Sequence, residues 1–205
     1  MGFGLGAVQG WLSEARTTFK ANAAELDALD EAIGDGDHGT NMARGFEAAA
    51  NMDFATHDTP QLLLKQVGMQ LLGTIGGAAG ALYGSFFLSL AAQWPSDPNT
   101  PRLAKAFRGA RDAVQSRGRA EVGDKTMIDA LDAAVKSLDA ERDETPLPEA
   151  IARASEAAAR GRDNTRDMVA RRGRAALLGE RTVGHVDPGA ASMALLFDIT
   201  ARHLG

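Results

Sequence analysis

The sequence predicts an all-α protein, a single domain of eight antiparallel helices in an up-and-down barrel or bundle with its site at one end. Three observations lead to this prediction. Apolar residues recur at helical spacing along most of the chain, whereas β-branched and aromatic residues are sparse. Thr59, Thr100 and Asp187 each place a capping side chain directly before a proline, as at many helix starts. The connections are short, which favours antiparallel neighbours.

The helices follow one another closely along the chain. The first is marked by an apolar stripe formed by Val8, Trp11, Leu12, Ala15, Phe19, Ala23 and Leu26. The fourth is the apolar run GALYGSFFLSLAA, and the sixth starts at Asp124–Thr126. The third, fifth and eighth start at the three prolines described above. After the first helix, the seven others are expected at about 40–52, 60–73, 80–93, 101–116, 125–139, 148–171 and 189–203.

Length and composition restrict the class of protein. A chain of 205 residues favours one domain, residues 1–205, which can bury roughly 70% of the surface that the unfolded chain exposes. Because the chain has no cysteine, disulfides and thiolate metal sites are excluded, and a reducing, cytoplasmic location is expected. The net charge of −5 argues against a nucleic-acid partner, and the apolar runs are too short for a membrane span.

Four loops differ from simple connections, namely residues 30–39, 73–80, 117–126 and 172–189. All four are rich in glycine, and three of them also carry charged side chains. Each follows an odd-numbered helix of the predicted series, and alternate loops of an up-and-down bundle lie at the same end. We therefore expect the four loops to meet at one end of the molecule and to form the functional site there.

The first of these loops, in DEAIGDGDHGTNMARGF, places Asp30, Asp35 and Asp37 among glycines. Two carboxylates about 4 Å apart repel by roughly 4 kcal/mol at an effective dielectric constant of 20, so three need protons or cations nearby. Mg²⁺ prefers such oxygen ligands and often shares them with phosphates. The glycines, together with a helix start at Thr40 and Asn41, suit a bound anion. The loop is therefore interpreted as a site for a metal and a phosphate.

Other interpretations of the loops apply to each one taken alone. An EF-hand is excluded, because with Asp35 as first ligand Thr40 stands at the glycine position and Phe46 at the final glutamate position. Aspartates that merely cap helices remain an alternative. The small residues of TIGGAAGALYG suit either a ligand or close helix packing. Met127 is expected either to cover a flat apolar ligand or to belong to the core. The four arginines of residues 171–192 are expected either to bind an anion or to form a solvated face.

Taken together and in order, the four loops resemble the DhaL family, the nucleotide-binding subunits of dihydroxyacetone kinases. The resemblance covers nearly the whole chain, from WLSEARTTFKANAAELDALDEAIGDGDHGTNMARGF through TIGGAAGALYGSFF and GDKTMIDAL to GRAALLGERTVGHVDPGAAS. It implies a barrel of eight antiparallel helices. It also implies that ADP or ATP binds at the end formed by the four loops, with two Mg²⁺ ions that bridge its phosphates.

The resemblance implies roles for particular residues. Asp30, Asp35 and Asp37 would hold the metal ions and, together with His38, form the catalytic group. The nucleotide would be bound by His38, Gly39, Thr40, Asn41, Ala78, Ala79, Gly118, Met127, Arg174, Asp187, Pro188 and Gly189. One departure is Ala79, which stands where the family has serine. Because a net hydrogen bond is worth roughly 0.5–1.5 kcal/mol, nucleotide binding should weaken rather than vanish.

The resemblance also implies a reaction and two partners. In this family a phosphohistidine protein of the DhaM type, in the phosphoenolpyruvate phosphotransferase chain, rephosphorylates the bound ADP. The γ-phosphoryl group then passes to dihydroxyacetone on a separate DhaK-type subunit, while metals and amides stabilise the developing charge. No segment here resembles that sugar-binding subunit. The chain is therefore expected to be a subunit that is inactive alone, either monomeric or homodimeric.

Three other functions stay open. A subunit of an ATP-dependent kinase for dihydroxyacetone or a related ketose would use the same residues but exchange its nucleotide freely. A phosphohistidine carrier modified at His38 would transfer phosphate without a nucleotide, although its acidic neighbours would repel the incoming phosphate. A non-catalytic regulatory module would only bind protein partners. The interior of the barrel is expected to be either filled by side chains or hollow enough for a lipid.

Overall fold

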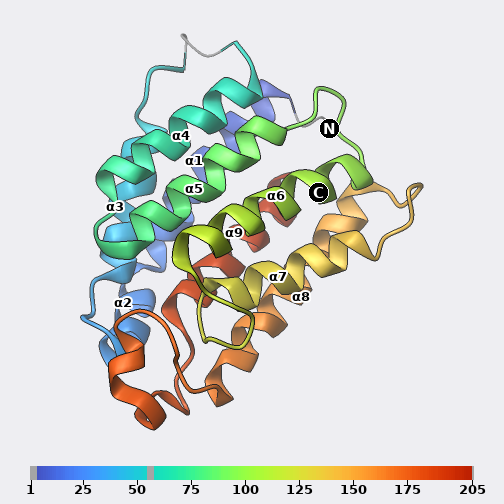
Figure 1. Ribbon diagram of the computed structural model, residues 1–205. Coiled ribbons are helices and arrows are strands. Elements are labelled where there is room, and N and C mark those ends of the chain that lie inside the picture. Colours follow the sequence, from blue (N-terminus) through green and yellow to red (C-terminus); the bar gives the residue numbers. More distant parts are fainter. Residues whose placement is uncertain (1–3, 55–57, 205) are drawn as a thin grey trace.

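The structure is a computed structural model that describes residues 4–54 and 58–204 (Figure 1). Within these ranges every regular element is helical, which confirms the predicted fold class. Each described helix is either too short or too polar to cross a lipid bilayer. The elements are α1 (Leu5–Ala21), α2 (Ala23–Ile33), α3 (His38–Ala50), α4 (Pro60–Thr74), α5 (Gly77–Gln93), α6 (Thr100–Gly118), α7 (Met127–Asp139), α8 (Leu147–Asn164), η2 (Thr165–Asp167), η3 (Ala175–Thr182) and α9 (Pro188–Leu204).

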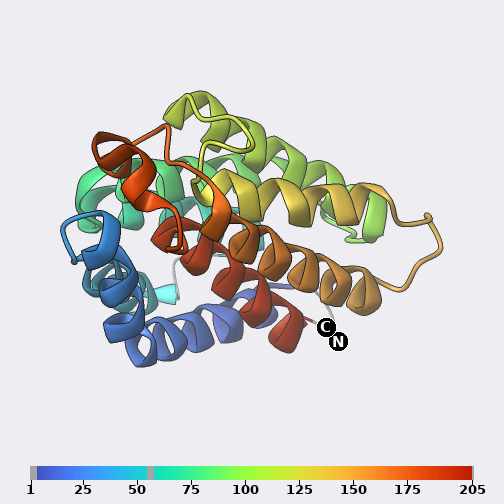
Figure 2. The same ribbon diagram turned by 90° about the horizontal axis from the view of Figure 1, so that it is seen from below.

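Eight of the helices form a closed ring (Figure 1). Around the ring, α1 is followed by α3, α4, α5, α6, α7, α8 and α9, and α9 packs back against α1. The remaining helix, α2, packs against α3 and α9. Seen from below, the start of α1 and the end of α9 lie side by side (Figure 2). The predicted barrel of eight helices is therefore present, with α2 as an additional helix that leads into the first loop.

The first predicted helix is two helices, because the chain breaks at Asn22. This residue has φ −99° and ψ 6°, and its side-chain amide donates to the carbonyl of Thr18 (2.8 Å). The apolar stripe gave no sign of the break, since Phe19 before it and Leu26 after it are both buried. The break turns α2 toward the first loop. The helix predicted over 148–171 also differs, because it ends at Asn164 and the chain continues through η2.

The predicted helix starts are present, with one change of capping residue. Thr59 caps α4 by accepting from the N–H of Leu62 (3.2 Å), and Asp187 caps α9 by accepting from the N–H of Ala190 (2.7 Å). The cap of α6 is Asn99 rather than Thr100, since the Asn99 side chain accepts from the N–H of Arg102 (3.1 Å). The hydroxyl of Thr100 instead donates to the carbonyl of Thr145 (2.7 Å) and ties the start of α6 to the loop between α7 and α8.

Aromatic side chains fill the interior of the ring. Phe19 and Phe46 stack with ring centroids 4.4 Å apart, and further ring contacts connect Trp11, Phe46, Phe86, Phe87, Phe107 and Phe197. The cavity left among these rings has a volume of about 30 Å³. Such a space holds a water molecule rather than a lipid chain. Of the two expectations for the interior, the filled barrel is the one observed.

Candidate active site

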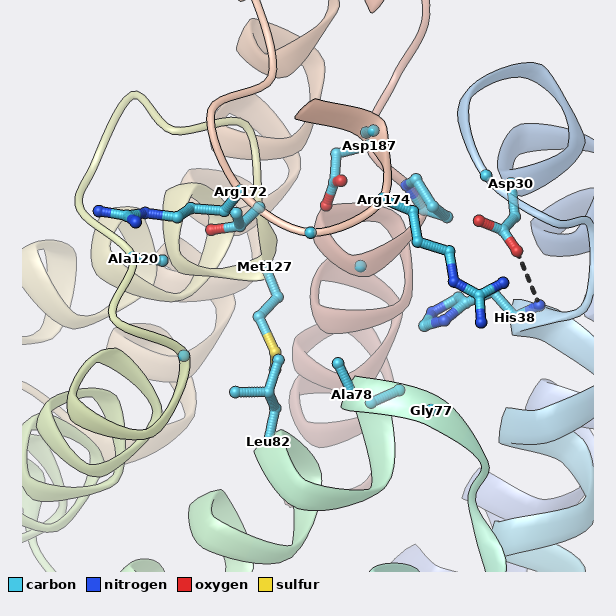
Figure 3. A pocket seen from close by; sticks show the side chains of 18 of the residues that line it. Asp30, His38, Gly77, Ala78, Leu82, Ala120, Met127, Arg172, Arg174 and Asp187 are labelled. Atoms are coloured by element: carbon cyan, nitrogen blue, oxygen red, sulfur yellow. Dashed lines mark hydrogen bonds between the residues drawn. The ribbon is translucent and has the colours of Figure 1, made fainter. Parts of the chain in front are cut away.

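A cavity of about 480 Å³ lies at one end of the ring (Figure 3). Its wall is built from residues within 30–41, 76–83, 114–128 and 172–189, which belong to the four unusual loops and the helix ends beside them. The prediction that these loops share one end is therefore confirmed. Since alternate connections of the ring face the same way, residues as far apart in sequence as Asp30 and Gly189 come together around one space.

Most of the predicted site residues line this cavity. They are Asp30, Asp35, Asp37, His38, Asn41, Ala78, Ala79, Gly118, Met127, Arg174, Asp187, Pro188 and Gly189. Gly39 and Thr40 are not among the residues that line it, and their nucleotide-binding role stays a prediction. A Cβ added to Gly39 would lie 1.9 Å from the carbonyl oxygen of Ala23, so this glycine faces α2. The N–H and hydroxyl of Thr40 donate to Asp27 (2.9 and 2.6 Å), which thereby satisfies the first turn of α3.

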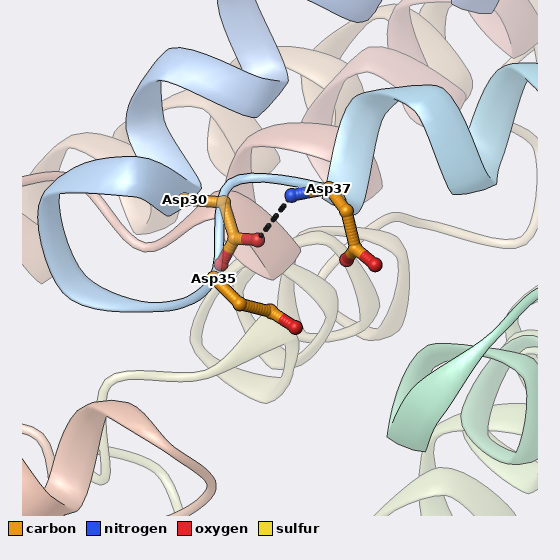
Figure 4. Close-up of side chains that lie close together, drawn as sticks. All are labelled: Asp30, Asp35 and Asp37. Atoms are coloured by element: carbon orange, nitrogen blue, oxygen red, sulfur yellow. Dashed lines mark hydrogen bonds between the residues drawn. The ribbon is translucent and has the colours of Figure 1, made fainter.

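The three aspartates converge as their spacing indicated (Figure 4). Asp30, Asp35 and Asp37 each offer an oxygen atom, and these atoms lie within 4.8 Å of one another. The Asp30 carboxylate is fixed at the start of α3, where it accepts from the N–H groups of Asp37 (3.0 Å) and His38 (3.3 Å). A Cβ at Gly34 would lie 2.1 Å from this carboxylate, which explains the glycine. Three converging oxygen donors fit a hard divalent cation.

Two groups of positive character lie near this acidic cluster, namely Arg174 and the N-terminus of α5. Arg174, from the fourth loop, forms an ion pair with Asp35 across the mouth of the cavity. The start of α5 also faces the cavity through Ala78 and Ala79, and no side chain caps its N-terminus. Its free N–H groups can therefore bind an anion. Gly77 has φ +64°, a left-handed conformation that suits glycine and lets the loop turn into this helix.

The other part of the cavity is apolar. Met127 at the start of α7 and Leu82 in α5 point toward each other (Figure 3). Val114 and Ala120 also contribute to this wall. A Cβ at Gly118 would lie 3.1 Å from the Leu82 side chain and would narrow this part of the cavity. Met127 is 4% exposed and belongs to the core, and it also lines the recess, where contact with a flat apolar ligand stays a prediction.

His38 is tied to the core beneath the cavity. Its Nε2 lies 2.8 Å from the hydroxyl of Ser192, which lies 2.8 Å from the hydroxyl of Tyr83. Burial lowers the pKa of His38, against the opposing effect of Asp30 and the other nearby carboxylates. This contact occupies Nε2, so only Nδ1 of the ring would be open to the phosphoryl group of a phosphohistidine carrier. Ser192 and Tyr83 were not predicted, and the sequence offers no signal that would link them to His38.

A buried lysine was also missed by the sequence analysis. Lys125 is 1% exposed, and its Nζ donates to the carbonyls of Thr165 and His185, both at 2.5 Å. It thereby joins the third loop to η2, which precedes the fourth loop, and to His185 within the fourth loop. Lys125 lies within the GDKTMIDAL segment, but a lysine in a left-handed conformation (φ 60°) is uncommon and no sequence pattern announces it. Burial lowers the pKa of Lys125 and raises the pKa of Asp187 to about 7.

A helical ring with converging carboxylates, an uncapped helix N-terminus and an apolar recess at one end has the features of a domain that binds a phosphate-bearing ligand with a divalent cation. The chain belongs to the Dak2 family, since the sequence pattern of the DAK2 domain matches residues 32–202. This result confirms the resemblance found from the loops.

Three relatives illustrate the match. The ADP-binding subunit DhaL of the PEP-dependent dihydroxyacetone kinase of Escherichia coli (strain K12) is 40% identical over 195 residues, which cover 93% of each chain. The corresponding subunit of kinase 2 of Listeria innocua is 42% identical over 185 residues, 87% of this chain and 85% of the relative. The crystal structure of the dihydroxyacetone kinase from C. freundii with AMP-PNP and Mg²⁺ superposes with a TM-score of 0.74 at 28% identity, over 95% of this chain and 33% of that one.

Proposed function

We propose that this chain is the nucleotide-binding subunit of a dihydroxyacetone kinase. Bound ADP would be rephosphorylated in place by a DhaM-type phosphohistidine protein, and the phosphoryl group would pass to dihydroxyacetone on a DhaK-type subunit. The observation that carries this proposal is the convergence of Asp30, Asp35 and Asp37 at the mouth of a cavity of about 480 Å³ that also holds an uncapped helix N-terminus. The names of the full-length relatives support the same assignment.

The acidic cluster would hold two Mg²⁺ ions. When bound, these ions would supply positive charge to the phosphates and to the group in transfer. The residues of the chain itself bind and orient. The start of α5 at Ala78 and Ala79 offers N–H groups to the phosphates, and Arg174 lies where it can exchange its partner Asp35 for a phosphate oxygen. The donor set supports magnesium because all three ligands are carboxylates.

The apolar recess would receive the base. Met127 and Leu82 present opposing apolar side chains, and the absence of a side chain at Gly118 leaves space beside Leu82. A planar base gains affinity from burial between two such surfaces. Asp187, Pro188 and Gly189 close the wall between this recess and the acidic cluster. The nucleotide would therefore lie with its phosphates at the mouth and its base inside.

Partner proteins would approach the mouth of the cavity. Large apolar side chains are exposed on the third and fourth loops, where Val122 is 52%, Leu177 87% and Val183 44% exposed. Exposed apolar groups beside a site suit contact with another protein. Both the phosphohistidine donor and the sugar-bearing acceptor would use this end in turn. The whole chain, residues 1–205, would act as one domain in the cytoplasm, in keeping with its lack of cysteine.

The nucleotide and metal content of the purified protein tests the proposal. About one ADP and two Mg²⁺ ions per chain should be released on denaturation after desalting. Asp30→Ala should lower the affinity for Mg·ADP in calorimetric titration by more than about tenfold, since even changes beside a metal ligand commonly cost 10–100-fold. Asp97→Ala is the control, because Asp97 is exposed and pairs with Arg102. A protein that binds neither ADP nor ATP with Mg²⁺ would contradict the proposal and favour the regulatory module.

A second candidate is an ATP-dependent kinase subunit with free nucleotide exchange. It is favoured by Ala79, which brings no hydroxyl group to the start of α5, and by the AMP-PNP in the C. freundii relative. An empty purified protein that binds ATP reversibly would support this alternative. Retained ADP would support phosphoenolpyruvate dependence instead. The same desalting experiment therefore separates the two.

A further inference from the structure

We infer that Ser192 is a positioning residue that selects, of the two neutral tautomers of His38, the one protonated at Nε2, with Nδ1 left as an acceptor. The inference rests on three contacts of one buried hydroxyl group. The Ser192 Oγ lies 2.8 Å from His38 Nε2, 2.8 Å from the hydroxyl oxygen of Tyr83, and 3.0 Å from the carbonyl oxygen of Gly189. Ser192 and Tyr83 are both 0% exposed, so bulk water does not compete for these places.

The single hydrogen of the Ser192 hydroxyl group decides the directions of the three hydrogen bonds. A serine hydroxyl has one hydrogen to donate and two lone pairs that accept. The Gly189 carbonyl can only accept, so all three contacts are hydrogen bonds only if Ser192 donates to that carbonyl. Tyr83 and His38 must then both donate to Ser192 Oγ. If Nε2 carried no hydrogen, Ser192 could satisfy either His38 or Gly189, and one of the three bonds would be lost.

The alternative arrangement of Tyr83 does not restore the missing bond. Ser192 could donate to the Tyr83 oxygen, but the Tyr83 hydroxyl would then need another acceptor. Within the described residues, Ser192 is the hydrogen-bond partner recorded for this hydroxyl. A buried donor without an acceptor is unfavourable. Tyr83 therefore donates to Ser192, and the neutral Nδ1–H tautomer makes one bond fewer at Ser192 Oγ than the Nε2–H tautomer.

The backbone holds the same histidine from the other side. The His38 N–H donates to the Asp30 carboxylate (3.3 Å), so both the main chain and the ring of His38 are anchored. An unprotonated Nδ1 cannot donate to a phosphate oxygen. A group that His38 contacts through Nδ1 must itself be a donor, such as a hydroxyl group or a water molecule. The resemblance implied a direct phosphate contact of His38, and this tautomer removes the ring nitrogen Nδ1 from that role.

Nuclear magnetic resonance of ¹⁵N-histidine-labelled, nucleotide-free protein at pH 8 tests the inference. Long-range ¹H–¹⁵N correlations distinguish the Nε2–H tautomer, the Nδ1–H tautomer and the imidazolium, and His38→Gln identifies the signals of His38 by their loss. The expected result is a His38 ring protonated at Nε2. A neutral ring protonated mainly at Nδ1, or an even mixture of the two neutral tautomers, would overturn the inference.

Two variants separate the role of Ser192 from simple packing. Ser192→Ala removes the acceptor, so the ratio of the Nε2–H to the Nδ1–H tautomer should fall about 2- to 12-fold, the value of one net hydrogen bond. Tyr83→Phe is the matched control, because it keeps the Ser192 acceptor and should leave Nε2–H dominant. An unchanged ratio in Ser192→Ala would refute the assignment, and the wild-type spectrum decides if that variant fails to fold. No nucleotide is added, so the result does not depend on the proposed function.

Discussion

Replacement of Lys125 by methionine tests how much the buried cation contributes to the end of the barrel that carries the site. The Lys125 ammonium donates to the carbonyls of Thr165 and His185, both at 2.5 Å. Methionine fills a similar volume but donates nothing. The Thr165 carbonyl keeps a second partner, the N–H of Met168 at 3.2 Å, whereas no other partner of the His185 carbonyl is recorded among the described residues. The loss therefore falls mainly on one carbonyl group.

The expected magnitude follows from that count. One buried acceptor left without a partner costs about 1–3 kcal/mol, and the bond lost at Thr165 adds to this cost. Removal of the ammonium offsets part of this cost, because the folded protein no longer has to bury a charged group; the same burial lowers the pKa of Lys125. We expect Lys125→Met to lower the free energy of unfolding by about 1–3 kcal/mol, because these two smaller contributions oppose each other.

Urea unfolding of the nucleotide-free protein, followed by far-ultraviolet circular dichroism, measures this difference. The matched control is Lys136→Met, since the Lys136 side chain is 69% exposed and pairs with Asp132 on the surface. That change should cost less than about 1 kcal/mol. A Lys125→Met protein as stable as the control variant, with the same dependence on urea concentration, would refute the reasoning. It would mean that water replaces the ammonium without loss.

Three further predictions concern the site. Ala79→Ser should tighten nucleotide binding about 2- to 12-fold in calorimetric titration, since it adds one hydroxyl donor beside the phosphates, and an unchanged affinity would place the phosphates elsewhere. Because burial raises the pKa of Asp187 to about 7 from its ordinary value of 3.8, the folded protein binds this proton more tightly than the unfolded chain. Stability without ligands should therefore fall as the pH rises from about 4 to about 7, and Asp187→Asn should flatten that part of the unfolding profile. Leu177→Ser, at a residue 87% exposed, should leave nucleotide affinity unchanged but raise the concentration of acceptor subunit needed for half-maximal transfer roughly 5- to 30-fold, and an unchanged value would exclude Leu177 from docking.

The sequence predicted the arrangement of the site better than its internal contacts. The sequence itself shows which loops are rich in glycine and that they follow alternate helices. Antiparallel packing of the helices is then enough to bring these loops to one end. The convergence of Asp30, Asp35 and Asp37 follows from spacing within one short loop. The break at Asn22 could not be predicted in this way, because buried apolar residues continue at helical spacing across it, with Phe19 before the break and Leu26 after it.

Contacts between distant segments could not be predicted in this way. Ser192 meets His38 across 154 positions of sequence, and nothing near either residue marks the other. Lys125 looks like any charged residue of a polar loop, and its burial depends on two carbonyls that only the folded chain supplies. Gly39 and Thr40 were predicted to bind the nucleotide because the resemblance implies it, and nothing in the sequence shows that Gly39 packs against Ala23 and that the Thr40 N–H bonds to Asp27 in α2.

The start of α1 and the end of α9 lie together, and Arg202 near that end pairs with Glu14 of α1 (2.8 Å) (Figure 2). The 17 residues of α9 separate this point from the cavity by about 25 Å. Any domain joined to the barrel by a tether at either helix end would start on the side remote from the nucleotide. An extended tether advances at most about 3.3–3.6 Å per residue, so at least about eight residues are needed to reach the mouth. The length of the tether would then set the local concentration of a phosphoryl acceptor carried on that domain. An acceptor on a separate subunit must instead meet the site by diffusion.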